Sequence, residues 1–175
     1  MSSQSSQPSQ PRYRIVLEKE DFKFSAAHFT LFPDGGAELL HGHNYRVRVE
    51  LAGSSLNDEG LLVDIERFKK VLRERCAHLD SRTLLPEASS RLQWSREGDA
   101  IEILCGERRY RFPADDVLLL PLVNTSMELF AQMLWDDLAP SLKGTQVEDL
   151  AVSVEESSGQ RCWYERGLVW AWGRR

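Results

Sequence analysis

The run of residues 45–51 constrains the fold of this chain more than any other segment. Apolar and charged side chains alternate along it, with Tyr45, Val47, Val49 and Leu51 on one side and Arg46, Arg48 and Glu50 on the other. Because successive side chains of a strand point to opposite faces, the alternation predicts a strand that buries one face in a core. His41 and His43 continue the apolar parity. Both imidazoles are therefore expected to point inward.

A third histidine has the same relationship to core side chains in an earlier segment. The extended pattern over residues 13–29 places His28 on one face with Phe22, Phe24 and Ala26. A stretch containing Pro, Asp and Gly at residues 32–36 then breaks the strand and leads into His41. Three of the chain's four histidines thus fall on inward faces of strands that we expect to be adjacent and antiparallel.

These three histidines have the spacing of a metal site. Two residues along a strand span roughly 6.6 Å, so His41 and His43 can converge on one ion, and His28 can supply a third ligand from the neighbouring strand. Three neutral imidazoles with an open fourth position are typical of catalytic zinc, whereas structural zinc has four closed ligands. The alternative is three separate core histidines, each satisfied by hydrogen bonds.

The rest of the chain predicts two helices, a small hairpin and two further strands. Asp64 can cap a helix over residues 65–79, where apolar residues recur at spacings of three and four. Residues 87–99 are polar and are expected to form a loop, and residues 101–104 and 109–112 an inserted β-hairpin. Thr125 to Glu128 have the form of a capping box before a helix that continues to Leu138. With strands at 147–157 and 161–170, helices segregate from an antiparallel sheet, which is the α+β class.

Composition excludes several classes of protein. The 175 residues suit one globular domain, which we place at residues 13–175 after a disordered Ser/Gln/Pro-rich tail at residues 1–12. A net charge of −5 without a basic block argues against nucleic acid as a partner. The three cysteines form no Cys-x-x-Cys pair, and neither a signal peptide nor an apolar run of about 18 residues is present. A cytoplasmic protein without a membrane partner is expected.

Glu156 is a carboxylate on an apolar face. Leu150, Val152 and Val154 define the inward face of the penultimate strand, and Glu156 continues their parity. Burying an unpaired carboxylate is costly, so Glu156 needs a partner. It can accept two parallel N–H bonds from an arginine or from the amino-pyrimidinone edge of a pterin or guanine. The alternative is a carboxylate at a strand end that already reaches water.

The two histidine segments resemble the signature of a known enzyme family. Phe24-Ser-Ala-Ala-His28 followed by Leu40-His41-Gly-His-Asn-Tyr45 is similar to the zinc-binding signature of the 6-pyruvoyltetrahydropterin synthase and 6-carboxytetrahydropterin synthase family. Further similar segments follow in the family's order: Leu62-Val-Asp64, Leu79-Asp80, Asn124-Thr-Ser126 and Val152-x-Val154-x-Glu156. The resemblance spans residues 14–167.

The resemblance implies a fold, an assembly and a ligand set. The fold is the tunnelling fold (T-fold), a four-stranded antiparallel sheet with two helices, here with the inserted hairpin. Three such sheets close into a barrel, and two trimers stack as a homohexamer, which would also remove exposed sheet edges. The implied substrate is a pterin, 7,8-dihydroneopterin triphosphate. The implied zinc ligands are His28, His41 and His43, the pterin anchor is Glu156, and Thr125 and Ser126 are implied to bind substrate.

The chain departs from the family at the positions that move protons. The family's catalytic cysteine stands four residues before the His-Gly-His segment, and Ala37 stands there in this chain. The family's Asp-His pair after the first helix is Asp80 followed by Ser81 here. Some branches use a glutamate in place of the cysteine, and Glu38 is displaced from that position by one residue. We interpret Glu38 and Asp80 as the catalytic residues, with burial raising the pKa of Glu38 toward the working pH, and His78 as a weaker substitute base.

Two functions remain open on these residues. The first is a zinc-dependent lyase of pterin metabolism, within queuosine or tetrahydrobiopterin biosynthesis, that forms a 6-carboxy- or 6-pyruvoyl-tetrahydropterin. The second is a pterin-binding family member that has altered or lost catalysis, which the missing cysteine and histidine favour. A purely structural hexamer is the least favoured hypothesis, because it leaves the inward histidines unexplained.

Overall fold

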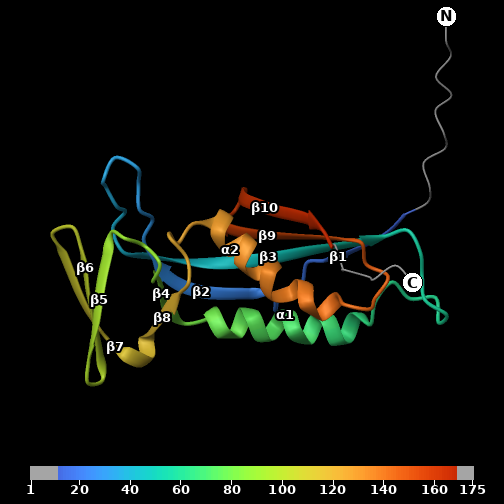
Figure 1. Ribbon diagram of the computed structural model, residues 1–175, viewed down its shortest axis with the longest axis horizontal. Coiled ribbons are helices and arrows are strands. Elements are labelled where there is room, and N and C mark those ends of the chain that lie inside the picture. Colours follow the sequence, from blue (N-terminus) through green and yellow to red (C-terminus); the bar gives the residue numbers. More distant parts are fainter. Residues whose placement is uncertain (1–11, 169–175) are drawn as a thin grey trace, which may run out of the picture.

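The structure is a computed structural model that describes residues 12–168. The tail expected at residues 1–12 lies outside this range except for Arg12, and the last expected strand is described only as far as Leu168. One seven-stranded sheet forms the body, in the order β10-β9-β3-β2-β4-β8, with β1 also paired to β3. A separate three-stranded sheet, β5-β6-β7, lies beyond one end of it (Figure 1).

The long strand β3 (His41–Gly53) organises the main sheet. Its first half pairs antiparallel with β2 (Lys23–His28), and its second half pairs with β1 (Tyr13–Leu17). The extended segment expected at residues 13–29 is thus two strands, separated by a turn in which Phe22 N donates to Lys19 O at 3.0 Å. The other edge of β3 pairs with β9 (Asp149–Ser157), which forms a hairpin with β10 (Gln160–Gly167).

Two strands extend the predicted antiparallel sheet with parallel pairing. β4 (Arg82–Pro86) pairs with β2, and β8 (Val117–Leu120) pairs with β4, so the sheet is mixed. Both are short runs without apolar alternation, which is why periodicity did not identify them. The α+β class and the tunnelling fold are confirmed, with a larger sheet than the four strands expected.

Both helices cover the same face of the main sheet. The helix α1 (Ile65–Leu79) begins after Asp64, whose side chain accepts a hydrogen bond from Arg67 N at 3.1 Å. α1 packs on β2, and α2 (Met127–Leu138) packs on β9 and β10 (Figure 1). The main core between helices and sheet includes fully buried side chains of both layers, among them Phe24, Tyr45, Leu51, Leu72, Phe130 and Leu150. Among the described residues, no helix is long and apolar enough to cross a membrane.

The capping box expected for α2 is wrong by one residue. Ser126 is the N-cap, and its hydroxyl accepts from Leu129 N at 3.5 Å. Thr125 instead lies fully buried, where its hydroxyl donates to Phe29 O at 2.7 Å. Tertiary contact with the end of β2 therefore sets where α2 begins, and Glu128 is not the capping partner that we expected.

The insertion is a three-stranded sheet rather than a hairpin. It consists of β5 (Leu92–Glu97), β6 (Ala100–Cys105) and β7 (Arg108–Pro113), followed by a 3-10 turn at Ala114–Asp116. The loop expected at residues 87–99 was wrong, because polar residues of β5 gain strand geometry from pairing with β6. A second core joins this sheet to the body through Phe29, Leu31, Leu85, Leu92, Ile101, Ile103 and Cys105.

A second 3-10 turn, Ala139–Leu142, follows α2.

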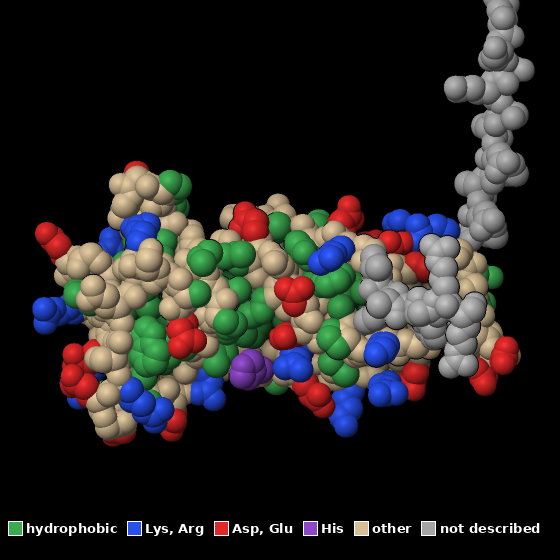
Figure 2. All heavy atoms as spheres, in the orientation of Figure 1, with side chains coloured by type: hydrophobic (Ala, Val, Ile, Leu, Met, Phe, Trp, Pro, Cys, Tyr) green, Lys and Arg blue, Asp and Glu red, His purple; other side chains and the backbone are tan. Residues whose placement is uncertain are grey.

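On the face seen in Figure 2, basic and acidic side chains are interspersed. Apolar side chains gather near the middle of this face, between the inserted sheet and α2.

Candidate functional site

Three histidines converge at the ends of β2 and β3 nearest the inserted sheet. His28 is the cross-strand partner of His41, and His43 follows two residues later on the same face of β3. One ligand atom from each imidazole lies within 4.8 Å of the others. His28 is fully buried, whereas His41 and His43 are half-buried. The structure thus brings together the three residues that strand parity predicted.

Main-chain carbonyls orient two of these rings. His28 Nδ1 lies 2.9 Å from Thr125 O, and His41 Nδ1 lies 2.7 Å from Leu39 O. A carbonyl oxygen only accepts hydrogen bonds, so Nδ1 carries the hydrogen and Nε2 presents its lone pair. This arrangement is typical of metal-ligating histidines.

Burial keeps His28 in the form that binds metal. Desolvation lowers the pKa of His28 below its usual value, and this effect exceeds the opposing effects of the bond to Thr125 and the charge of Glu156. The imidazole is therefore neutral near pH 7. Three neutral nitrogen donors suit zinc or another borderline transition metal, and they do not by themselves select among such metals.

Tyr45 links the histidines to Glu156. Its hydroxyl oxygen lies 2.8 Å from His28 Nε2 and donates to Glu156 Oε1 at 3.0 Å. A hydroxyl has one hydrogen, so donation to Glu156 leaves the lone pair of His28 Nε2 without a donor. Burial, together with the charge of Glu156, raises the pKa of Tyr45, so the hydroxyl keeps that hydrogen. The unmatched lone pair is what a metal ion at this point would satisfy, so the donor set fits the metal that the sequence predicted.

Sequence reasoning treated Tyr45 only as a core residue. Its parity with His41 and His43 was the available signal, because residues two apart on a strand share a face. The long-range contact with Glu156, 111 residues away, was not visible in any local pattern.

The carboxylate of Glu156 lies beside the histidines. Glu156 Oε1 is 3.2 Å from His28 Nε2 and 3.6 Å from His43 Nε2, and Gln160 Nε2 donates to Oε2 at 3.1 Å. A cavity of about 430 Å³ opens next to this carboxylate, lined by Gly42, His43, Asn44, Arg46, Glu155, Glu156, Ser157 and Ser158. The Glu156 carboxylate thus accepts hydrogen bonds from a tyrosine and an amide rather than from an arginine. It faces a space large enough for a small ligand.

Glu38 lies on the loop that enters β3. Its carboxylate accepts a hydrogen bond from Thr30 N at 2.9 Å, and its own main-chain N donates to Thr30 O at 2.9 Å. Burial raises the pKa of Glu38, but the bonds from Thr30 and the charges of His41 and His28 lower it by more, so the net shift is downward. The expected rise is therefore wrong, and Glu38 is ionised at neutral pH.

Asp80 lies just after α1, at the edge of β2 that pairs with β4 rather than with β3. Its carboxylate accepts from Ser25 N at 2.6 Å and from the Ser81 hydroxyl at 3.0 Å, at the end of α1. His78 is exposed on the last turn of that helix. Among the residues described, no hydrogen bond or ion pair joins Asp80, Ser81 or His78 to the three histidines. One copy of the chain does not assemble Asp80 with the metal ligands.

Thr125 and Ser126 perform structural roles in this geometry. Thr125 holds His28 through its carbonyl oxygen and β2 through its hydroxyl, and Ser126 caps α2. Their expected binding of substrate stays a prediction.

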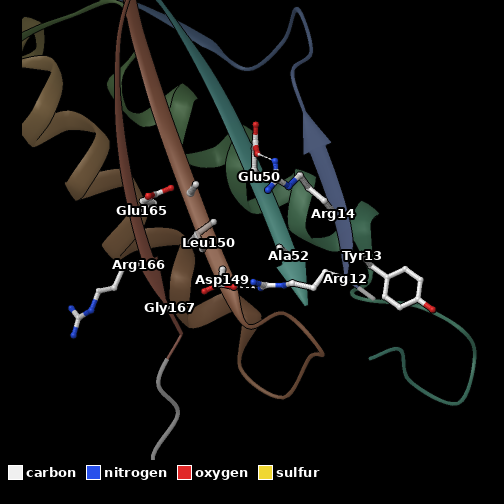
Figure 3. A pocket seen from close by; sticks show the side chains of 11 residues that line it. Arg12, Tyr13, Arg14, Glu50, Ala52, Asp149, Leu150, Glu165, Arg166 and Gly167 are labelled. Carbon is white, nitrogen blue, oxygen red and sulfur yellow. Dashed lines mark hydrogen bonds and ion pairs between the residues drawn. The ribbon is translucent and has the colours of Figure 1, made fainter. Parts of the chain in front are cut away.

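A groove at the far end of the main sheet has different chemistry. It is lined by residues of β1, β3, β9 and β10, and four of its charged side chains form pairs: Arg12 with Asp149, and Arg14 with Glu50 at 3.4 Å (Figure 3). Among the described residues, the group of side chains that could hold a metal ion is His28, His41 and His43, and none of them lines this groove. We therefore place the candidate site at the histidines.

Comparisons with known proteins agree on one family. Residues 17–167 match the family model described as 6-pyruvoyl tetrahydropterin synthase. A protein of Methanocaldococcus jannaschii, provisionally named a 6-carboxy-5,6,7,8-tetrahydropterin synthase, is 29% identical over 149 residues, which are 83% of this chain and 91% of that protein.

Solved structures give the same family. The 6-pyruvoyl tetrahydropterin synthase of Plasmodium falciparum superposes with a TM-score of 0.82 at 29% identity, covering 89% of this chain and 98% of that one. A Plasmodium vivax 6-pyruvoyltetrahydropterin synthase, studied with a catalytic glutamate replaced by alanine, gives a TM-score of 0.80 at 30% identity, covering 90% and 99%.

Proposed function

The chain belongs to the 6-pyruvoyl tetrahydropterin synthase family, and from this premise we propose that it is a zinc-dependent lyase acting on 7,8-dihydroneopterin triphosphate or a close relative. The observation that carries the proposal is the convergence of His28, His41 and His43 within 4.8 Å, beside the carboxylate of Glu156. Zinc, when bound, polarises coordinated substrate oxygens and lowers the pKa of a coordinated hydroxyl.

Glu38 is the proposed proton acceptor. It is ionised at neutral pH, and a hydrogen bond from Thr30 N at 2.9 Å holds its carboxylate on the loop that leads into His41. The Plasmodium vivax relative also has a catalytic glutamate, which supports a carboxylate in this role. Ala37, at the family's cysteine position, has no group that can accept a proton.

Glu156 is the proposed anchor for the pterin ring. Each carboxylate oxygen has two lone pairs, so Glu156 can accept N–H bonds from a ligand while keeping its bond from Tyr45. The adjacent cavity of about 430 Å³, lined by His43 and Glu156, supports this role. Substrate contacts by Thr125 and Ser126 complete the proposed set.

We also propose that the protein is a homohexamer of two stacked trimers. Support comes from the family and from exposed apolar side chains next to the site, such as Leu39 at 73% and Val123 at 62% exposure. Within this assembly, Asp80 would contribute to the site of a second copy, because in its own copy it is bonded to Ser25 at the edge of β2 that pairs with β4. A cytoplasmic location and a place in queuosine or tetrahydrobiopterin biosynthesis are part of the same proposal.

The second candidate function is a pterin-binding protein without synthase activity. The absence of a cysteine at Ala37 and of a histidine at Ser81 favours it. Metal and ring recognition do not separate the two candidates, because both need His28, His41, His43 and Glu156.

Incubation of zinc-loaded protein with 7,8-dihydroneopterin triphosphate separates them. Release of triphosphate with formation of a new pterin supports the lyase, and identification of the product by mass spectrometry distinguishes the 6-carboxy from the 6-pyruvoyl compound. Tight binding of unchanged substrate would support the binding protein. Neither binding nor turnover would contradict both.

A further inference from the structure

The loop that carries Glu38 is held from outside by the inserted sheet. We propose that Arg91 and Arg108 are positioning residues for the Glu38 carboxylate, so that the insertion is the support of the catalytic loop. The inference rests on the proposed function, in which Glu38 accepts a proton.

The loop between β2 and β3 has few internal constraints. Residues 32–36 are all exposed. Within the loop, the isolated bridge between Leu31 and Ala37 and the bond from Phe32 N to Gly36 O at 2.8 Å define the turn, and Gly35 adopts a positive φ of 93°. A short exposed turn of this kind opens easily unless other parts of the chain hold it.

Arg91 closes the tip of this loop. Its guanidinium donates to three main-chain carbonyl oxygens: Phe32 O at 2.6 Å, Gly36 O at 2.9 Å, and Gly35 O. The planar guanidinium presents donors in a fixed fork, so one side chain can bind several carbonyls of one turn. Arg91 immediately precedes β5, and its position is therefore set by the inserted sheet.

Arg108 acts at Glu38 itself. Arg108 Nη1 donates to the main-chain carbonyl oxygen of Glu38. On the other side, the main-chain N and the carboxylate of Glu38 both bond to Thr30. Glu38 is thus held between the end of β2 and the first residue of β7, and hydrogen bonds with a charged donor are stronger than neutral ones.

Apolar packing holds the loop against the inserted sheet. Phe29 stacks on Tyr110 with ring centroids 5.9 Å apart. Leu31, at the base of the loop, belongs to the second core with Ile103, and Ala37 and Leu40 pack against that core. The two arginines therefore approach the loop from a sheet that is already docked.

A general base must be correctly positioned as well as present. A base must lie within hydrogen-bonding range of the proton that it takes, and a displacement of about 1 Å can lower a rate about 10²-fold. Loss of the Arg108 bond should therefore affect turnover through Glu38, while the metal ligands on β2 and β3 stay in place.

The experiment compares Arg108→Met with Arg109→Met. Arg109 lies on the same strand but is exposed on its other face, so the second variant controls for loss of charge. Removing a hydrogen bond from a charged group changes an equilibrium by about 10- to 100-fold. We expect Arg108→Met to lower kcat by about that factor with KM and zinc content unchanged, and Arg109→Met to match the native protein.

Two further variants test whether the loss of kcat in Arg108→Met acts through Glu38. In a Glu38→Gln background, Arg108→Met should cause no additional loss of kcat, because the residue that it positions is already inactive. Arg108→Lys retains a positively charged N–H donor and should recover part of the rate. An equal loss of kcat with and without Glu38 would overturn the proposal, and so would an unchanged kcat in Arg108→Met.

Hydrogen exchange tests whether Arg108 holds the Glu38 loop, even if the protein shows no turnover. Amides of residues 30–38 should exchange about 10-fold faster in Arg108→Met than in Arg109→Met, with melting temperatures alike. If the native protein has no activity, the proposed function fails, yet faster exchange still supports the positioning role. Unchanged exchange in these amides would refute it independently of activity.

Discussion

The imidazole of His28 is bonded through Nδ1 to the main-chain carbonyl oxygen of Thr125, 2.9 Å away, although 97 residues separate the two. This bond joins the end of β2 to the residue before the cap of α2. It turns Nε2 toward His41 and His43, so the position of α2 orients the most buried of the proposed metal ligands.

Replacement of His41 by alanine should remove stoichiometric zinc. The variant leaves two imidazoles, and we expect the metal content measured by elemental analysis to fall from about one ion per chain to near zero, since a zinc site of this kind uses three protein ligands. His78→Ala is the matched control, because His78 is exposed on α1. Full metal retention in His41→Ala would show that this triad is not the site.

Replacement of Glu38 by glutamine should remove turnover and keep the metal. The amide cannot accept the proton, and the loss of a general base lowers kcat by about 10² to 10⁴. Zinc content and pterin binding should match the native protein. Glu20→Gln, at an exposed residue, is the control for loss of one negative charge. A native rate in Glu38→Gln would assign the base to another group.

Replacement of Gly53 by alanine should destabilise the fold. A Cβ at Gly53 would lie 2.2 Å from Gln146 O and 2.7 Å from Leu62 Cδ1, and the first of these atoms is main chain. Overpacking typically lowers the free energy of unfolding by about 1–3 kcal/mol, which urea denaturation can measure. Gly42→Ala, on the same strand, is the control, since its Cβ would be 3.5 Å from Ala26 O, an ordinary contact. Equal stability of the two variants would contradict the packing.

The pair Glu155–Arg161 should make stability depend on pH in acid. The hydrogen bond from Arg161 lowers the pKa of Glu155 below 4.5. A carboxyl with a lower pKa in the folded state stabilises the fold above its unfolded value, and this stabilisation is lost as the pH falls through the folded pKa. Glu155→Gln should therefore be less stable by about 1 kcal/mol at pH 6, with a smaller difference at pH 3.

Glu165→Gln is the control for this pH effect, because Glu165 is exposed on the same hairpin. Urea unfolding of the three proteins at both pH values measures it. A difference between native protein and Glu155→Gln that does not change with pH would argue against the ion pair.

Light scattering tests the proposed hexamer. At micromolar concentration we expect a mass about six times the 20.1 kDa of the chain, because closed rings remove the exposed strand edges at β8 and β10. Leu39→Asp places a charge on a side chain that is 73% exposed in one copy, and it should lower the mass because the proposed hexamer covers this side chain with another copy. A monomer in the native sample would contradict the assembly.

Local periodicity in the sequence determined the elements around the site. The alternation at Tyr45 to Leu51 predicted β3, and its continuation to His41 and His43 predicted which way the imidazoles point. A strand has a period of two, so side-chain direction follows from counting residues once the strand is recognised. The same reasoning placed α1 after Asp64 and predicted that His28 would face the other two histidines.

Tertiary structure alone decided the contacts that give these residues their chemistry. β4 and β8 became strands because they pair in parallel, and α2 begins at Ser126 because Thr125 is bonded to Phe29. The downward shift of the Glu38 pKa results from hydrogen bonds to Thr30 and from the charges of His41 and His28, which act on the carboxylate through space. The physical reason is shared: hydrogen bonds and charge interactions act through space between residues distant in the chain, and no local period in the sequence records them.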